Sequence, residues 1–168
     1  LSRRAAAEGM VLLKNENETL PLKRGSRVAV FGKAQADYVK GGGGSGDTTV
    51  AYVRSLAQGL RMKQDEGKIE IFEPLERFYA EDVQAQYAAG ATPGKTREPI
   101  LDDALVQQAR AFTDTAVITI CRFSGEDYDR TGQPHDGDYF LSFEEEHMVR
   151  KVLAAFPRVT VVLNTGGM

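Results

Sequence analysis

The sequence predicts an α/β protein, a three-layer α/β/α sandwich with a mostly parallel sheet of about six strands. Apolar runs rich in β-branched residues indicate buried strands at residues 27–32, 69–72, 115–120 and 159–163. Amphipathic segments of helical period lie between these runs. This alternation is typical of βαβ units, which place parallel strands between layers of helices. The 168 residues are expected to form one domain.

The N-terminal part is expected to contain a helix, an extended stretch and the first strand. Residues 2–14 have an apolar and a polar side at helical spacing, which predicts a helix. Pro21 disfavours helix in the residue before it, so residues 20–22 are expected to be extended. The strand at residues 27–32 has a continuously apolar centre, as central strands of parallel sheets do.

The later helices are expected at residues 49–62, 76–89, 101–112 and 142–156. Asp47 or the threonine after it is the expected cap of the first of these helices. Ser142 and Glu145 form a capping box at the start of the last one. Two prolines and two glycines make residues 90–99 a loop. The last strand is expected to end in a turn at residues 164–167, where a parallel sheet normally continues into a helix, so we expect a piece of a larger protein.

The stretch with the most candidate catalytic side chains is residues 124–130, directly after the strand at residues 115–120. It holds three carboxylates, on Glu126, Asp127 and Asp129, together with Arg130. Close carboxylates raise one another's pKa and a nearby arginine lowers it, so the cluster can set one acid apart. Open α/β sheets build their sites at the carboxyl ends of parallel strands. The alternative is a solvated acidic loop whose exit Arg130 fixes.

The glycine-rich residues 41–47 are the second notable stretch. Their letters fit the dinucleotide-binding fingerprint, but they begin nine residues after the first strand ends at Gly32. The fingerprint should follow a strand directly, and no Gly-Lys-Ser/Thr follows, so nucleotide binding is the least favoured interpretation. Glycine lets the backbone approach a ligand or another chain closely. The stretch is therefore a site loop or a flexible turn.

Composition and charge narrow the kinds of molecule and environment that we expect for this chain. A net charge of −3 argues against a nucleic-acid surface, and no apolar run reaches the ~18 residues of a membrane helix. A single cysteine, Cys121, excludes an internal disulfide and is expected to be a buried, inert thiol. The lack of disulfides favours a cytoplasmic location, with secretion left open. His135 and His147 lie far apart without a metal-ligand pattern, so neither a metal nor a cofactor is expected.

Four stretches, taken together, carry a resemblance to a known family. They are residues 7–15 followed by 20–22, the glycine-rich residues 40–47, the acidic residues 124–130, and the final strand and turn at 161–167. In this order they resemble the second, α/β-sandwich domain of glycoside hydrolase family 3, the β-glucosidase type. The resemblance implies that residues 1–168 are a fragment with this domain alone, because the chain is too short for the family's (β/α)8 barrel of ~250 residues.

The resemblance implies a retaining β-glycosidase that removes terminal non-reducing β-D-glucosyl residues. The family's nucleophile is an aspartate on the barrel, and its general acid/base is a glutamate on a sandwich-domain loop. The matching position here is Glu126, followed by Asp127 where the family usually has glycine. The implied substrate-binding residues are Gly43, Gly44, Ser45, Asp47 and Tyr128, with Asp129 and Arg130 as structural residues at the site.

The implied partners are a β-glycoside substrate and the barrel of the same protein. The chain alone is then expected to be inactive, and to have an apolar or mixed patch that the barrel covers. Association with copies of itself through that patch would make a homo-oligomer. The alternative function is a non-catalytic carbohydrate-binding or domain-interaction module. A shared site requires the loops at residues 41–47 and 121–141 to lie on one edge of the sheet.

Overall fold

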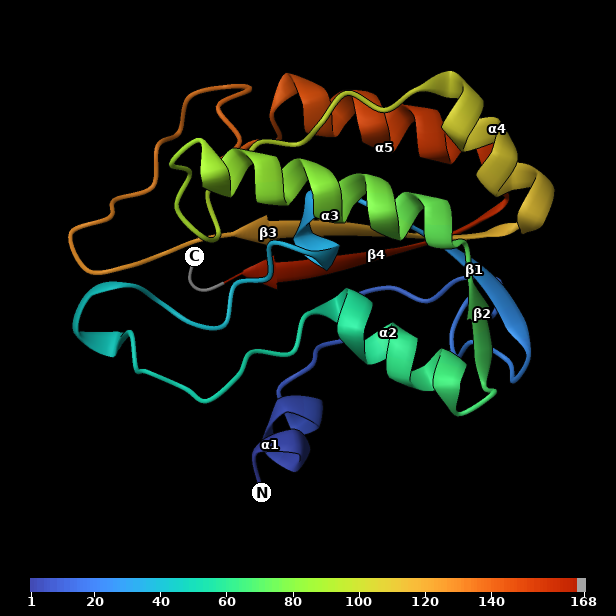
Figure 1. Cartoon of the computed structure of the whole chain (residues 1–168), viewed down its shortest axis with the longest axis horizontal. Helices are drawn as coiled ribbons and strands as arrows, with labels where there is room; N and C mark the ends of the chain where they lie inside the picture. Colours follow the sequence, from blue (N-terminus) through green and yellow to red (C-terminus); the bar gives the residue numbers. More distant parts are fainter. Residues whose placement is uncertain (166–168) are drawn as a thin grey trace.

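A computed structural model describes residues 1–165 and shows a sheet of four parallel strands in the order β2-β1-β3-β4 (Figure 1). The strands are β1 (Ser26–Phe31), β2 (Ile69–Ile71), β3 (Thr115–Arg122) and β4 (Arg158–Thr165). β1 pairs with both β2 and β3, and β3 pairs with β4 along its whole length. The α/β class and the parallel sheet are confirmed. The described chain has four strands rather than about six, one for each apolar run in the sequence.

Helices on both faces of the sheet complete the three layers, and residues 1–165 form five α-helices in all. They are α1 (Ser2–Glu8), α2 (Leu56–Asp65), α3 (Glu73–Ala88), α4 (Asp103–Phe112) and α5 (Phe143–Ala155). Helices α3, α4 and α5 cover one face of the sheet, and α2 lies on the other (Figure 1). Within residues 1–165, no helix has both the length and the apolar content needed to cross a membrane.

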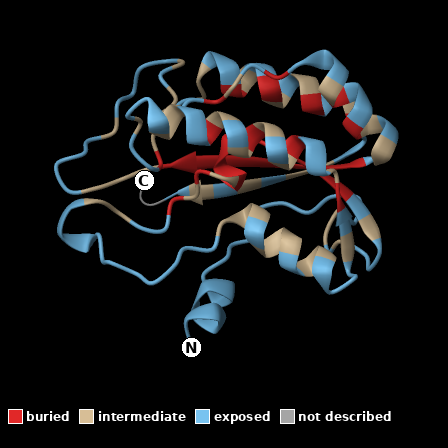
Figure 2. Cartoon of the chain, in the orientation of Figure 1, coloured by how far each residue is buried: buried red, intermediate tan, exposed pale blue. Residues whose placement is uncertain are grey.

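The core has two parts because side chains of a strand alternate between the faces of a sheet. In β1, Ala29 and Phe31 point into the larger cluster under α3, α4 and α5, while Val28 and Val30 point toward α2. Figure 2 shows the buried residues concentrated on the sheet and on the inner sides of the helices. All eight residues of β3 are buried, so the strand that leads into the acidic loop is covered on both faces.

Two helices, α1 and α2, differ from the expected ranges by more than three residues at one end. Helix α1 ends at Glu8, with Gly9 as its C-cap, instead of continuing to about residue 14. None of its residues is buried, so tertiary packing does not extend it beyond two turns. Helix α2 begins at Leu56 rather than at residue 49, because Ser55 and Gln58 form a capping box there. The cap expected at Asp47 or the threonine after it is therefore wrong.

The other three helices begin and end within three residues of their expected bounds. Ser142 and Glu145 form the expected capping box at the start of α5. Helix α3 begins three residues earlier than expected, at Glu73, with a proline in its first turn. Cys121 is buried, and this burial raises the pKa of its thiol to about 11, as expected for an inert cysteine. The glycines of the expected turn at residues 164–167 lie outside the described residues.

Candidate active site

The glycine-rich loop and the acidic loop lie side by side at the carboxyl ends of the strands (Figure 1). Gly43 and Gly125 form an isolated parallel β-bridge. The Gly43 N–H donates to the Ser124 carbonyl at 2.8 Å, and the Glu126 N–H donates to the Gly43 carbonyl at 3.4 Å. The prediction that both loops share one edge is confirmed. Backbone pairing makes the glycine-rich stretch part of the site's framework rather than a flexible turn.

Close approach explains why glycines occupy this contact. A Cβ on Gly43 would lie 2.6 Å from the Phe123 ring, closer than a carbon–carbon contact allows. Gly44 adopts a φ of 74°, and a Cβ there would lie 2.4 Å from the Cβ of Glu126 and 2.8 Å from its Oε2. The glycines therefore let one backbone pack directly against the acidic side chain of the other loop.

Glu126 presents its carboxylate at the surface, held by one neighbour. Its Oε2 accepts a hydrogen bond from the Ser45 N–H at 2.8 Å. This backbone donor, followed by the Ser45 hydroxyl, holds the pKa of the exposed Glu126 carboxyl below its usual range. The sequence pointed to the neighbouring carboxylates and Arg130 as the groups that set the acid apart. The structure instead assigns the shift to Ser45, across the two loops.

Tyr128 and Asp47 also lie on these loops, with different neighbours. The Tyr128 ring packs edge-on against Phe123, with 5.5 Å between centroids, and the Lys95 ammonium lies 3.3 Å from its centroid. Asp47 forms an ion pair with Lys40 at 2.7 Å, within the glycine-rich loop itself. Tyr128 is thus fixed near Glu126 by an aromatic contact, and Asp47 stabilises the loop that carries Ser45.

Contacts among its own residues hold the rest of the acidic loop in place. Arg130 donates to the Phe123 carbonyl at 3.0 Å and forms an ion pair with Asp138 at 2.5 Å. Arg130 therefore links the start of the loop, at Phe123, to its returning limb, at Asp138. Asp127 adopts a φ of 60°, the left-handed region that favours glycine. This backbone conformation gives a physical reason for the glycine that the resemblance leads one to expect after Glu126.

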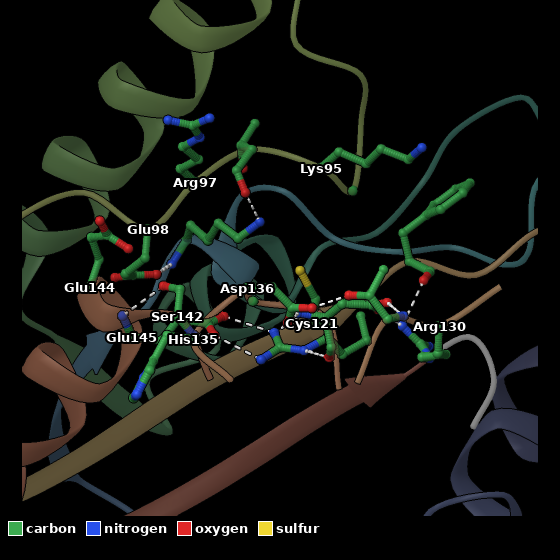
Figure 3. A pocket seen from close by; sticks show the side chains of 18 of the residues that line it. Lys95, Arg97, Glu98, Cys121, Arg130, His135, Asp136, Ser142, Glu144 and Glu145 are labelled. Carbon is green, nitrogen blue, oxygen red and sulfur yellow. Dashed lines mark hydrogen bonds and ion pairs between the residues drawn. The ribbon is translucent and has the colours of Figure 1, made fainter. Parts of the chain in front are cut away.

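A pocket of about 570 Å³ lies behind the acidic loop (Figure 3). It is lined by Lys33 and by residues 94–98, 121–123, 128–131, 135–138 and 142–145. Glu98, Glu144 and Glu145 lie on one side of it and Lys95 and Arg130 on the other (Figure 3). Glu126 is not among these lining residues, so its carboxylate does not line the pocket.

Sequence reasoning missed the buried charges of this pocket. Arg122 and Glu145 form an ion pair at 2.7 Å with side chains that are 9% and 5% exposed. Glu98 is buried too, and its Oε2 accepts a hydrogen bond from the Lys33 N–H at 2.9 Å. The one available signal was Arg122 itself, a charged residue at the end of a mostly apolar strand, because a buried charged residue needs a partner.

Burial raises the pKa of Glu98 to about 8, and the Lys33 N–H opposes this shift only in part. A carboxyl whose pKa is higher in the folded state stabilises the fold below its unfolded pKa, near 4.5, and this stabilisation is lost as the pH rises toward 8. The wild-type chain should therefore lose free energy of unfolding between pH 5 and pH 8.

Glu98→Gln should remove most of that pH dependence, because glutamine resembles the protonated acid and keeps an acceptor for Lys33. We expect the variant to gain about 2–4 kcal/mol relative to the wild type on going from pH 5 to pH 8. Urea unfolding at both pH values measures this. Glu81→Gln, at an exposed position of α3, is the matched control. Parallel pH curves for Glu98→Gln and the wild type would contradict the buried-acid assignment.

The curated proteins that this chain resembles in sequence include two bacterial β-glucosidases. It is 45% identical over its whole length to β-glucosidase A of Butyrivibrio fibrisolvens, where it covers 22% of that protein. It is 35% identical to a β-glucosidase of Ruminococcus albus, with 96% of this chain and 17% of the relative covered. The chain therefore spans about a fifth of the length of these relatives.

Solved structures agree with the sequence comparison. The chain superposes on a β-glucosidase from Paenibacillus barengoltzii with a TM-score of 0.86 and 35% identity, covering 98% of this chain and 18% of that one. It superposes on β-glucosidase 3B of Thermotoga neapolitana in complex with α-D-glucose with a TM-score of 0.83 and 33% identity, covering 98% and 23%. Residues 10–168 match the glycosyl hydrolase family 3 C-terminal domain. The chain thus belongs to glycosyl hydrolase family 3, as its C-terminal α/β domain.

Proposed function

We propose that this chain supplies the general acid/base of a retaining β-glucosidase, and that Glu126 is that residue. The observation that carries the proposal is the position of its carboxylate. It is exposed at the carboxyl edge of a parallel sheet and held by Ser45 of the neighbouring loop. A group that must reach a substrate bound mainly by another domain needs this combination of fixed direction and open access.

The reaction has two steps, and Glu126 acts in both. It first donates a proton to the glycosidic oxygen of a terminal β-D-glucosyl residue while a carboxylate nucleophile attacks the sugar. It then accepts a proton from the water that cleaves the glycosyl–enzyme bond. Retaining enzymes hold the two carboxyl groups about 5–5.5 Å apart. In the proposal the nucleophile comes from a (β/α)8 barrel of the same protein, so this chain alone is inactive.

In this proposal, assembly with the barrel also changes the pKa of the Glu126 carboxyl. In the chain alone, the Ser45 N–H lowers the pKa of Glu126, which favours the ionised form. The first step needs the protonated form near working pH. A negatively charged nucleophile close by, together with exclusion of water, raises the pKa of the acid. The barrel would therefore complete the proton donor as well as supply the nucleophile.

Exposed apolar side chains support the proposal that the barrel docks on this chain. Met10, Val11, Leu12 and Leu13 are 65–80% exposed, in a stretch without regular structure after α1. Val50, Tyr52 and Val53, beyond the glycine-rich loop, are exposed as well. Monomeric proteins rarely leave so many large apolar groups in water without a partner. A homo-oligomer formed through the same groups is the competing arrangement.

The pH dependence of the complete enzyme tests the proposal. As the pH rises past the pKa of the acid, the proton donor is lost and kcat/KM falls. Glu126→Gln should remove this basic limb when an activated aryl β-glucoside is the substrate. In the isolated chain, NMR titration should place the pKa of the Glu126 carboxyl below the pKa that the enzyme's basic limb reports. A basic limb that persists unchanged in Glu126→Gln would assign the acid to another residue.

The second candidate function is a non-catalytic carbohydrate-binding or domain-interaction module. The exposed apolar residues favour its interaction form, because they need a partner whether or not Glu126 reacts. Under this alternative, Glu126→Gln leaves both limbs of the pH profile in place.

A further inference from the structure

Arg122 connects three parts of the structure through one buried side chain. It is the last residue of β3, and its guanidinium donates to the Cys121 carbonyl at 2.7 Å. It also donates to the carbonyls of Asp138 and Phe140, on the limb of the acidic loop that returns toward α5. Both oxygens of Glu145 accept from it, at 2.8 and 2.7 Å. We call this set of contacts the Arg122 clamp.

Glu145 fixes the clamp to the body of the domain. It lies in the first turn of α5, where its Oε2 also accepts a hydrogen bond from the Ser142 N–H at 3.0 Å. Met148 and Val152, on the same helix, are wholly buried against the sheet. The position of the guanidinium is thus set by a strand and a helix of the core, and the loop between them is attached to it at both ends.

A second set of contacts connects the Arg122 clamp to the rest of the acidic loop. Asp138, whose carbonyl binds Arg122, uses its carboxylate to bind Arg130 at 2.5 Å and the Thr131 N–H at 2.7 Å. Arg130 in turn donates to the carbonyl of Phe123, the residue that follows Arg122. The segment between Phe123 and Asp138, which carries Glu126, is therefore closed by these contacts, and both of its ends lie next to Arg122.

We propose that Arg122 is a positioning residue for Glu126, and that its forked contacts with the loop carbonyls and Glu145 hold the acid in line with the leaving oxygen. The proposal rests on the function proposed above for Glu126. Arg122 does not touch the substrate, because its side chain is buried behind the loop. A buried pair with satisfied donors is a rigid support, and proton transfer loses efficiency when the acid moves by about 1 Å.

Only arginine can make this clamp. The planar guanidinium has five donors in a fixed fork, whereas the ammonium of lysine is a point charge with three. Arg122→Lys keeps a positive charge beside Glu145, so it avoids an unpaired buried carboxylate, but it cannot reach Glu145 and the carbonyls of both Asp138 and Phe140 together. The variant therefore separates the geometry of the clamp from its charge.

The test uses the complete enzyme and aryl β-D-glucosides whose phenols range from activated to poor leaving groups. Arg122→Lys should lower kcat/KM roughly tenfold for the poorest leaving group and less than about twofold for a dinitrophenol, because only the former needs a well-placed acid. KM should change little. Arg27→Lys, in an exposed ion pair with Glu70, is the matched control and should leave the series unchanged.

The outcomes of these measurements distinguish the positioning role proposed for Arg122 from the acid/base role proposed for Glu126. A steeper leaving-group dependence in Arg122→Lys supports the positioning role, and an equal loss for every leaving group, after titration of active sites, overturns it. Glu126→Ala is measured in the same series, and no leaving-group dependence there would refute the acid/base assignment itself. If Arg122→Lys does not fold, Glu145→Gln replaces it and is read in the same way, because it weakens the same clamp and leaves its carbonyl contacts intact.

Discussion

Glu126→Ala in the complete enzyme should lower kcat/KM for an unactivated β-linked disaccharide by roughly 10²–10⁴-fold, the range of a general acid/base. The sugar that leaves is a strong base, so its bond breaks only as it receives a proton. An activated phenol leaves without this help, so glycosylation from an aryl substrate should change much less. The second step stays slow because no base activates the water. A burst of phenol followed by slow turnover is the expected time course.

Azide and a neighbouring carboxylate provide the controls for this prediction. Azide needs no deprotonation to attack the glycosyl–enzyme, so it should accelerate turnover of the activated substrate in Glu126→Ala and give a β-glucosyl azide. Asp129→Ala removes an exposed carboxylate from the same loop and should change the rates by much less. Near wild-type hydrolysis of disaccharides by Glu126→Ala would reject the assignment and make Asp127 or Asp129 the candidate.

Gly44→Ala should reduce the same activity by roughly 10²-fold, since a displacement of about 1 Å at a catalytic group has this effect. The added Cβ would lie 2.4 Å from the Glu126 Cβ and 2.8 Å from its Oε2, so the acid must move. The φ of 74° adds backbone strain for any residue with a Cβ. The loss should fall on kcat for poor leaving groups, which steady-state kinetics over the leaving-group series would measure.

Gly46→Ala is the matched control for this change. Gly46 lies in the same loop, and a Cβ there would meet no atom within 4 Å. We expect near wild-type kinetics and an unchanged melting temperature from Gly46→Ala. Equal activity losses in the two would mean that loop flexibility, rather than contact with Glu126, explains the effect.

The sequence alone determined the fold class and most elements, and it named Glu126 as the candidate acid. Apolar β-branched runs located all four strands of the described chain, and in β1 and β3 burial on both faces explains the continuous run. The capping box at Ser142 fixed the start of α5, because its two hydrogen bonds join residues three apart. Glu126 could be named as a candidate because the residues around it that carry the resemblance, 124–130, are contiguous in the chain.

Sequence reasoning was weaker where no tertiary partner supports a local pattern. Residues 10–13 carry the apolar side expected of a helix, but they are exposed in irregular backbone after α1. The glycine-rich run stayed ambiguous for the opposite reason. Its use depends on Phe123 and Glu126, which pack against it from a loop about eighty residues away. Propensity describes a segment alone, and both of these segments are decided by what lies against them.

Only the tertiary structure decided which groups surround the Glu126 carboxylate and its loop. The Ser45 N–H that lowers the pKa of Glu126 comes from 81 residues earlier in the chain. Arg122 and Glu145, which hold the back of the loop, are 23 residues apart, and Glu98 accepts from Lys33 across 65 residues. Parallel strands need long crossover connections, so residues distant in sequence meet at their carboxyl ends. Their burial and charge then set the pKa values and the geometry, which no local pattern encodes.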